Sequence, residues 1–361
     1  MSVILVLDDL VKECEALVAG LKRALGSKAK VVPFIASAVL KKGDSFERYL
    51  ASWIDESLAG KDIGLIVCDK ELGLYGNLRG LSATPVSAVA QQKGIPFCQY
   101  SRLAREDKRE FARFKRLRQW SADEITLEGL DPAAWVPQVV GLFGGFERIR
   151  TEYKRLDYRA TRTPAVALAA ILGKPESESR IALYGSGEQG FLKEILTFYD
   201  PAKPDMAALF KRMPRMLGNW LFLSILRFPG ILVNEVAAAS YLNIAHGVFV
   251  RKTVQRHFGS AVYSGPFSEL GRWWWRADLD ALIGDASCKD GREYAKKKLG
   301  AVPPCLDPQS RERAGYYCML TQKPVSAQNS CGGVSWFPSG ADLARIRKDK
   351  FEQIAALVGM Y

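Results

Sequence analysis

Three carboxylates and one hydroxyl follow short apolar runs in the first third of the sequence: Asp8, Asp9, Asp69 and Ser101. Where such runs form parallel strands, the residues after them meet at the carboxyl edge of the sheet, where open α/β sheets bind their ligands. Carboxylates gathered there repel one another unless a cation neutralises them, and an all-oxygen site suits Mg²⁺. Beside Mg²⁺, the Asp69 carboxylate can attack a phosphoryl donor and form an aspartyl phosphate, to which Ser101 would donate a hydrogen bond.

The segments that must position these residues alternate between strand and helix patterns over residues 1–155. Apolar runs of strand length occupy Val3–Leu7, Lys30–Ile35, Ile63–Cys68, Ile95–Tyr100 and Ala122–Leu127. Apolar residues recur at helical spacing in Leu10–Leu25, Phe46–Leu58, Thr84–Gln92, Arg102–Arg118 and Trp135–Lys154. This alternation predicts a five-stranded parallel, doubly wound α/β domain of the flavodoxin-like type.

The motifs around the four polar residues resemble those of response-regulator receiver domains, over roughly residues 1–150. They are LDD at Leu7–Asp9, IVCDKELG at Ile66–Gly73 and CQYS at Cys98–Ser101. The resemblance implies that Asp8, Asp9, Asp69 and the backbone carbonyl of Glu71 hold Mg²⁺. It also implies that Asp69 is the phosphoacceptor, that Ser101 senses the phosphate, and that a histidine kinase or another protein is the partner.

One position departs from the receiver pattern. Receivers carry a Lys at the end of the fifth strand, whereas Leu127 and Glu128 are near that place and no Lys lies between Arg118 and Arg148. A Lys there would pair with phosphoryl oxygens, and a Glu would repel them. Besides a phosphorylated regulator, a degenerate receiver that serves as a protein–protein docking module therefore stays open, as does an α/β domain whose Asp residues only cap loops.

Residues 156–361 have a mainly helical pattern that becomes aromatic and irregular after Ala261. Within 230–285, the segment Leu232–Ile283 resembles a winged helix of the excisionase and MerR type, although the insertion Ala245–Phe249 does not fit its short turn. The resemblance implies a helix in a major groove and a wing on phosphates. The implied nucleic-acid contacts are Arg251, Lys252, Arg256, Arg272 and Arg276. The alternative is that the tryptophans at 273–275 are core or an interface patch.

Two further patterns, a glycine-rich segment and a set of cysteines, are weaker indications of a function. Gly185–Gly190 (GSGEQG) follows an expected strand at Arg180–Tyr184, the setting of a dinucleotide-binding loop. Because Glu188 would repel phosphate and no acid-ended strand follows, we favour a plain turn, and an enzyme with a site in the C-terminal region is a rival function. In the tail at 286–361, Cys288, Cys305, Cys318 and Cys331 lack the close pairs of a zinc knuckle, so we expect reduced thiols.

The amino-acid composition and the net charge limit the classes of function that this protein can have. Hydrophobic residues make up 48% of the 361 residues, which excludes wholesale disorder. The formal net charge of +12 makes nucleic acid the leading partner class, although excess Lys and Arg can also serve solubility alone. No apolar run approaches the ~20 residues of a membrane span, and the first run is too short for a signal peptide. We therefore expect a cytoplasmic signalling protein, rather than an enzyme, that binds DNA or another nucleic acid through its C-terminal region and forms a homodimer. The basic helix expected at Arg102–Arg118 would be an output surface that contacts a second copy or another protein.

Overall fold

The computed structural model describes residues 1–34, 45–73, 81–101, 125–127, 129–157, 163–185 and 206–358, together with Arg113, Phe114 and Leu117. These residues belong to two compact units, and each is described by itself. The first unit contains the described residues of 1–101, 125–157 and 206–220, and the second contains those of 113–117, 163–185 and 221–358. No helix in the described part of the chain has the length and apolar character that a membrane span needs.

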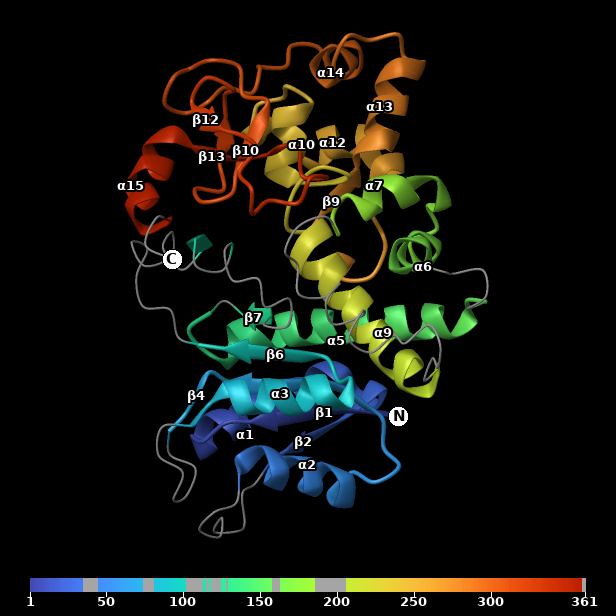
Figure 1. Cartoon of the computed structure of the whole chain (residues 1–361). Helices are drawn as coiled ribbons and strands as arrows, with labels where there is room; N and C mark the ends of the chain where they lie inside the picture. Colours follow the sequence, from blue (N-terminus) through green and yellow to red (C-terminus); the bar gives the residue numbers. More distant parts are fainter. Residues whose placement is uncertain are drawn as a thin grey trace. The chain divides into compact units, whose positions relative to one another are not determined.

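A five-stranded sheet forms the centre of the first unit (Figure 1). Its strands are β1 (Ser2–Leu7), β2 (Ala29–Pro33), β3 (Ile63–Asp69), β6 (Phe97–Tyr100) and β7 (Ile125–Leu127). They lie in the order β2-β1-β3-β6-β7, and every neighbouring pair is parallel. The predicted parallel α/β sheet is therefore confirmed, and the strand order is compatible with a flavodoxin-like fold.

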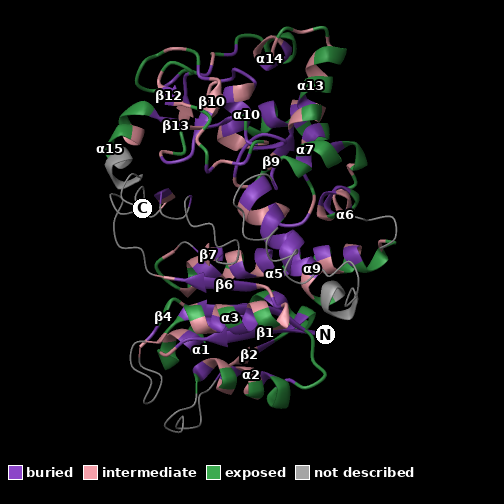
Figure 2. Ribbon diagram, viewed as in Figure 1, coloured by how far each residue is buried: buried purple, intermediate pink, exposed green. Residues whose placement is uncertain are grey.

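Helices pack against one another around this sheet. α1 (Val11–Leu25) packs on α5 (Pro132–Arg155), and α2 (Phe46–Ser57) packs on α3 (Ala83–Lys93). All six residues of β1 are buried, as expected of a central parallel strand with both faces covered, and Figure 2 shows exposed residues mainly on the outer helix faces. The predicted strands and helices that lie in the described residues of this unit thus fall within a few residues of the observed ones.

Local sequence signals place the helix ends. The Ser45 hydroxyl accepts from the backbone N–H of Arg48 at 3.3 Å and caps α2, and the Asp131 carboxylate accepts from Ala134 at 3.0 Å and caps α5. α3 ends at Gly94, whose φ of +68° is the left-handed conformation that glycine adopts without strain. A two-stranded ribbon of β4 (Glu71–Leu72) and β5 (Leu81–Ser82) lies between β3 and α3 in the chain.

One helix from far along the chain completes the first unit. α9 (Met206–Trp220) packs on α5. The two helices approach closely at Gly218, where a Cβ atom would lie 2.3 Å from the Phe146 ring. Only a glycine permits this crossing without displacing the ring.

The second unit is built from short elements. Its helices are α6 (Pro164–Ile171), α7 (Glu178–Ala182), α10 (Glu235–Tyr241), α11 (His246–Phe249), α12 (Lys252–Gln255), α13 (Arg276–Asp285), α14 (Gly291–Leu299) and α15 (Lys348–Val358). β8 (Leu232–Asn234) pairs antiparallel with β9 (Trp273–Trp275). A separate sheet has the order β11-β10-β13-β12, from β10 (Tyr316–Cys318), β11 (Pro324–Val325), β12 (Ser330–Cys331) and β13 (Ala344–Arg347).

One expectation for the second half of the chain is overturned. The strand expected at Arg180–Tyr184 is wrong, because α7 occupies Glu178–Ala182. The buried residues there are Ser177, Ile181 and Tyr184, and this spacing is helical. The strand–loop–helix setting of a dinucleotide loop is therefore missing on its strand side, while residues 186–190 lie outside the described residues. Most of Arg102–Arg118 lies outside them as well.

Candidate functional site

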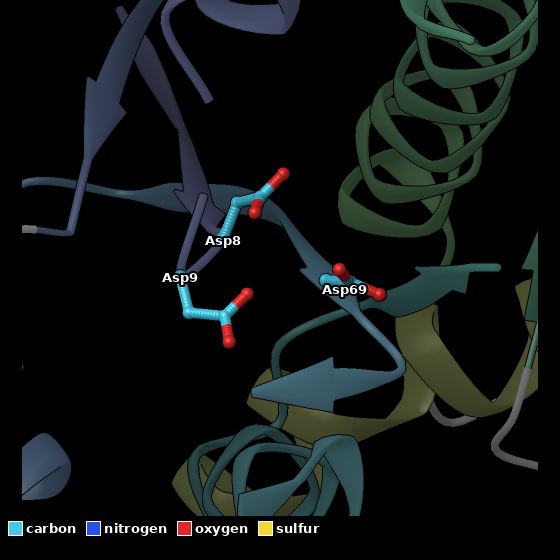
Figure 3. Close-up of side chains that lie close together, drawn as sticks. All are labelled: Asp8, Asp9 and Asp69. Atoms are coloured by element: carbon cyan, nitrogen blue, oxygen red, sulfur yellow. The ribbon is translucent and has the colours of Figure 1, made fainter. Parts of the chain in front are cut away.

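The acidic site consists of Asp8, Asp9 and Asp69, at the carboxyl edge of the parallel sheet (Figure 3). β1 and β3 are neighbours in parallel register, with Leu7 opposite Cys68, so the residues that follow them are adjacent. One carboxylate oxygen from each of the three residues lies within 4.8 Å of the others. Among the described residues, no other group of three acidic, histidine or cysteine side chains lies closely enough together to share a cation.

Asp8 is fixed in place from two sides. Its side chain is buried, Oδ1 accepts from the backbone N–H of Leu10 at 2.8 Å, and Oδ2 accepts from the Tyr100 hydroxyl at 2.5 Å. Tyr100 in turn stacks on Trp135 of α5, with ring centroids 4.3 Å apart. Burial, followed by the Asp8 charge, raises the pKa of Tyr100, so the phenol keeps its proton and remains a donor. The carboxylate therefore has a defined position before any ligand binds.

Asp69 is a carboxylate whose pKa is raised by its surroundings. It is the last residue of β3, it is half-buried, and its Oδ1 accepts from the backbone N–H of Glu71 at 3.2 Å. Burial is the largest cause that raises its pKa, to about 6; the Glu71 backbone N–H lowers it, and the charges of Asp8 and Asp9 raise it further. A cation bound beside Asp69 would stabilise its charged form. It would offset both the cost of burying this carboxylate and its repulsion by Asp8 and Asp9.

Two other predicted site residues are close in the chain to these strand ends. Glu71 is the exposed first residue of β4 and supplies the backbone N–H that reaches Asp69. Ser101 is half-buried and follows Tyr100, which lies opposite Asp69 in the sheet register. Tyr100 also lies opposite Leu127 of β7, the position that precedes Glu128, and Glu128 is outside the described residues.

The donor set fits a divalent cation of the magnesium type. Carboxylate oxygens are the protein ligands that Mg²⁺ takes, together with waters and phosphate oxygens. Asp9 and Asp69 are both partly exposed, so a cation held between them would keep positions open toward solvent. Tyr100 and Trp135 are site residues that the sequence reasoning missed. The signal for Tyr100 was its place beside Ser101 at the end of an apolar run.

The residues predicted to contact nucleic acid divide into two groups. Arg251, Lys252 and Arg256 are exposed, at the start of α12 and directly after it. Arg276 pairs with Asp342 at 2.6 Å and lies 5.1 Å from the centre of the Tyr241 ring, so its guanidinium already has partners within the unit.

Arg272 is exposed and donates to the Gln255 side chain. Trp274 and Trp275 are buried, and Trp273 donates from Nε1 to the Leu226 carbonyl at 2.9 Å. The interpretation of these tryptophans as core residues therefore holds for the two buried ones. Of the two arginines that flank β9, Arg272 precedes the strand and is exposed, whereas Arg276 follows it and is paired with Asp342.

Comparisons of this chain with protein-family models, curated proteins and solved structures return no match. The acidic site and the exposed charges of the second unit are therefore the features of this protein that point to a function.

Proposed function

We propose that the first unit is a receiver-like regulatory domain that binds Mg²⁺ and accepts a phosphoryl group on Asp69. The observation that carries this proposal is the convergence of Asp8, Asp9 and Asp69 within 4.8 Å at the carboxyl edge of a parallel sheet. Asp69 is partly exposed and can be reached by a donor, whereas Asp8 is buried and held by two hydrogen bonds. Asp69 is thus suited to be the nucleophile and Asp8 to be a fixed cation ligand.

The chemical step uses the Asp69 carboxylate. One of its oxygens forms a bond to the phosphorus of a phosphodonor, and the bond from phosphorus to the donor's leaving atom breaks, with its electron pair going to the leaving group. Bound Mg²⁺ would neutralise the added negative charge between the three carboxylates. The hydroxyl of Ser101 would donate to a phosphoryl oxygen, and the Glu71 carbonyl would be a further cation ligand.

A phosphodonor assay tests this proposal. The full chain is incubated with Mg²⁺ and phosphoramidate, and covalent phosphate is detected by intact mass. We expect modification of the native protein, loss of modification in Asp69→Asn, and no change in Glu56→Gln, an exposed carboxylate on α2. Unmodified native protein under conditions where it binds Mg²⁺ would overturn the phosphoacceptor role and favour the docking module, which the missing Lys after Leu127 already supports.

We further propose that the second unit binds nucleic acid, with the segment 230–285 acting as a winged helix. The exposed cations Arg251, Lys252 and Arg256 support this proposal, as does the order of elements around them, in which helices α10, α11 and α12 precede strand β9 and helix α13. Arg276 is an unfavourable phosphate contact because it is paired with Asp342. Arg272 remains the wing contact.

Salt-dependent binding of duplex DNA tests the second proposal. Each phosphate contact contributes about 0.9 to the slope of log K against log salt, so Arg251→Gln, Lys252→Gln and Arg256→Gln together should reduce the slope by about 3. The matched control removes the exposed charges of Lys296, Lys297 and Lys298 on α14. Equal slopes for the two triple variants would contradict the proposed surface.

A further inference from the structure

A cavity lies in the first unit, near the opposite edge of the sheet from the acidic site. Its volume is about 490 Å³. The walls come from the end of α2 and the loop after it, the start of β3, the turn before β6, and the facing sides of α5 and α9. This size lies within the range of roughly 300–1,000 Å³ that is usual for small-molecule sites.

Positive charge dominates the walls of this cavity. Its lining contains six basic residues, Lys61, Lys93, Arg150, Lys154, Lys211 and Arg215, and three acidic ones, Asp55, Asp62 and Glu147. All three acids are already paired: Asp55 with Lys93 at 2.6 Å, and both Asp62 and Glu147 with Arg150. Six positive charges against three negative ones leave an excess of three.

The excess charge lies on residues from separate elements. Lys61 follows α2, Lys154 is near the end of α5, and Lys211 is on α9. These three lysines are exposed, and within the described part of the chain none of them forms an ion pair. Arg215 of α9, a residue that is only 2% exposed, also belongs to the lining. A guanidinium stays protonated in a protein and offers several donors to an oxyanion, so a buried one at a cavity wall is suited to an anionic ligand.

The rest of the lining is apolar. Ile54, Leu58 and Ile95 contribute aliphatic surface, and Phe146 and Pro214 contribute flat surface. A free inorganic anion would leave this surface unused. A ligand with both a phosphate group and a planar or apolar part would use both halves of the cavity.

We propose that this basic cavity binds a phosphorylated small molecule of mononucleotide size. The lysines and Arg215 hold the phosphate, and the apolar wall holds the remainder of the ligand. The site is separate from the acidic site, and it does not depend on phosphorylation of Asp69. Ligand binding would therefore persist in Asp69→Ala.

Calorimetric titration of the full chain with AMP, GMP, CMP and UMP at low ionic strength tests the proposal. Adenosine, ribose 5-phosphate and inorganic phosphate are titrated in parallel. The combined variant Lys61→Gln, Lys154→Gln, Lys211→Gln removes three exposed charges of the cavity. The matched control removes Lys22, Lys28 and Lys30, three exposed lysines of the same unit that do not line it.

The expected result is binding of at least one nucleoside monophosphate, weakened about tenfold or more in the cavity variant and unchanged in the control. Because the altered side chains are exposed, both variants should unfold at the temperature of the native protein, and this is measured beforehand. No binding in the millimolar range, or equal weakening in both variants, would overturn the proposal. Inorganic phosphate binding as tightly as every nucleotide would also overturn it, since the apolar wall would then have no role.

Discussion

Replacing Asp69 with Asn is expected to stabilise the metal-free protein at neutral and alkaline pH. The pKa of Asp69 is raised from its ordinary value of 3.8 to about 6, chiefly by burial. The folded state therefore binds the proton more tightly than the unfolded state. That proton contributes its full stabilisation below about pH 3.8, and the contribution is lost as the pH rises through 6. Above that value the native protein carries an unfavourable charge, which Asn lacks.

The size of the effect follows from the two pKa values. At about 1.4 kcal/mol for each pKa unit, a rise from 3.8 to about 6 corresponds to about 3 kcal/mol. Asp69 is only half-buried, so solvent screening reduces the expected stabilisation to about 1–2 kcal/mol. The difference between Asp69→Asn and the native protein should disappear as the pH falls toward 3.8.

Urea denaturation at about pH 8 and about pH 4 measures this difference as the change in the free energy of unfolding. Glu56→Gln, which removes an exposed carboxylate outside the acidic site, is the control and should change little at either pH. Adding Mg²⁺ at the higher pH should stabilise the native protein more than Asp69→Asn. If Asp69→Asn is no more stable than the native protein at the higher pH, the account of the acidic site as a cluster of unfavourably placed charges is wrong.

Two further substitutions test the surroundings of the acidic site and the packing of the first unit. Tyr100→Phe removes the donor to the buried Asp8 carboxylate, so we expect a loss of about 1–3 kcal/mol of stability and weaker Mg²⁺ binding. Urea denaturation measures the stability, and metal titration measures the Mg²⁺ affinity. An unchanged free energy of unfolding would contradict the role of this hydrogen bond. Gly218→Ala places a methyl group against the Phe146 ring and should destabilise the protein by about 1–3 kcal/mol in thermal unfolding. Gly144→Ala on α5 meets open space and should be neutral or stabilising by up to about 1 kcal/mol, so similar losses in both variants would refute the close crossing.

The sequence predicted the sheet and the acidic site because both follow from long, regular patterns. Buried parallel strands such as Val3–Leu7 are continuous apolar runs, and the residues after two adjacent parallel strands must be neighbours. The sequence alone therefore predicted that Asp8 and Asp69, which are far apart in the chain, lie close together in the fold. The hydrogen bond from Tyr100 to Asp8 was not predictable in the same way, because it depends on a third strand and on side-chain direction.

The second unit was less predictable because its elements are short. Strands of two to four residues, such as Pro324–Val325 and Ala344–Arg347, contain too few positions to show an alternating pattern. The run Arg180–Tyr184 is compatible with either a strand or a helix, and in the structure Glu178–Ala182 forms helix α7. The pairing of Arg276 with Asp342 also joins residues far apart in the chain, so a cation that seemed available in the sequence is occupied.

Helix α5 has a consequence for the first unit as a whole. Trp135 near one end stacks on Tyr100, the partner of Asp8, while Arg150 near the other end lines the basic cavity. At about 1.5 Å per residue, these two positions are about 22 Å apart along one continuous helix. A tilt of α5 as one body would therefore displace both the Trp135 contact and the wall of the cavity. If Mg²⁺ and a nucleotide both bind as proposed, thermodynamic linkage requires that Mg²⁺ changes the nucleotide affinity by the same factor by which the nucleotide changes the Mg²⁺ affinity. Two titrations therefore decide whether this unit integrates two chemical inputs or keeps them separate.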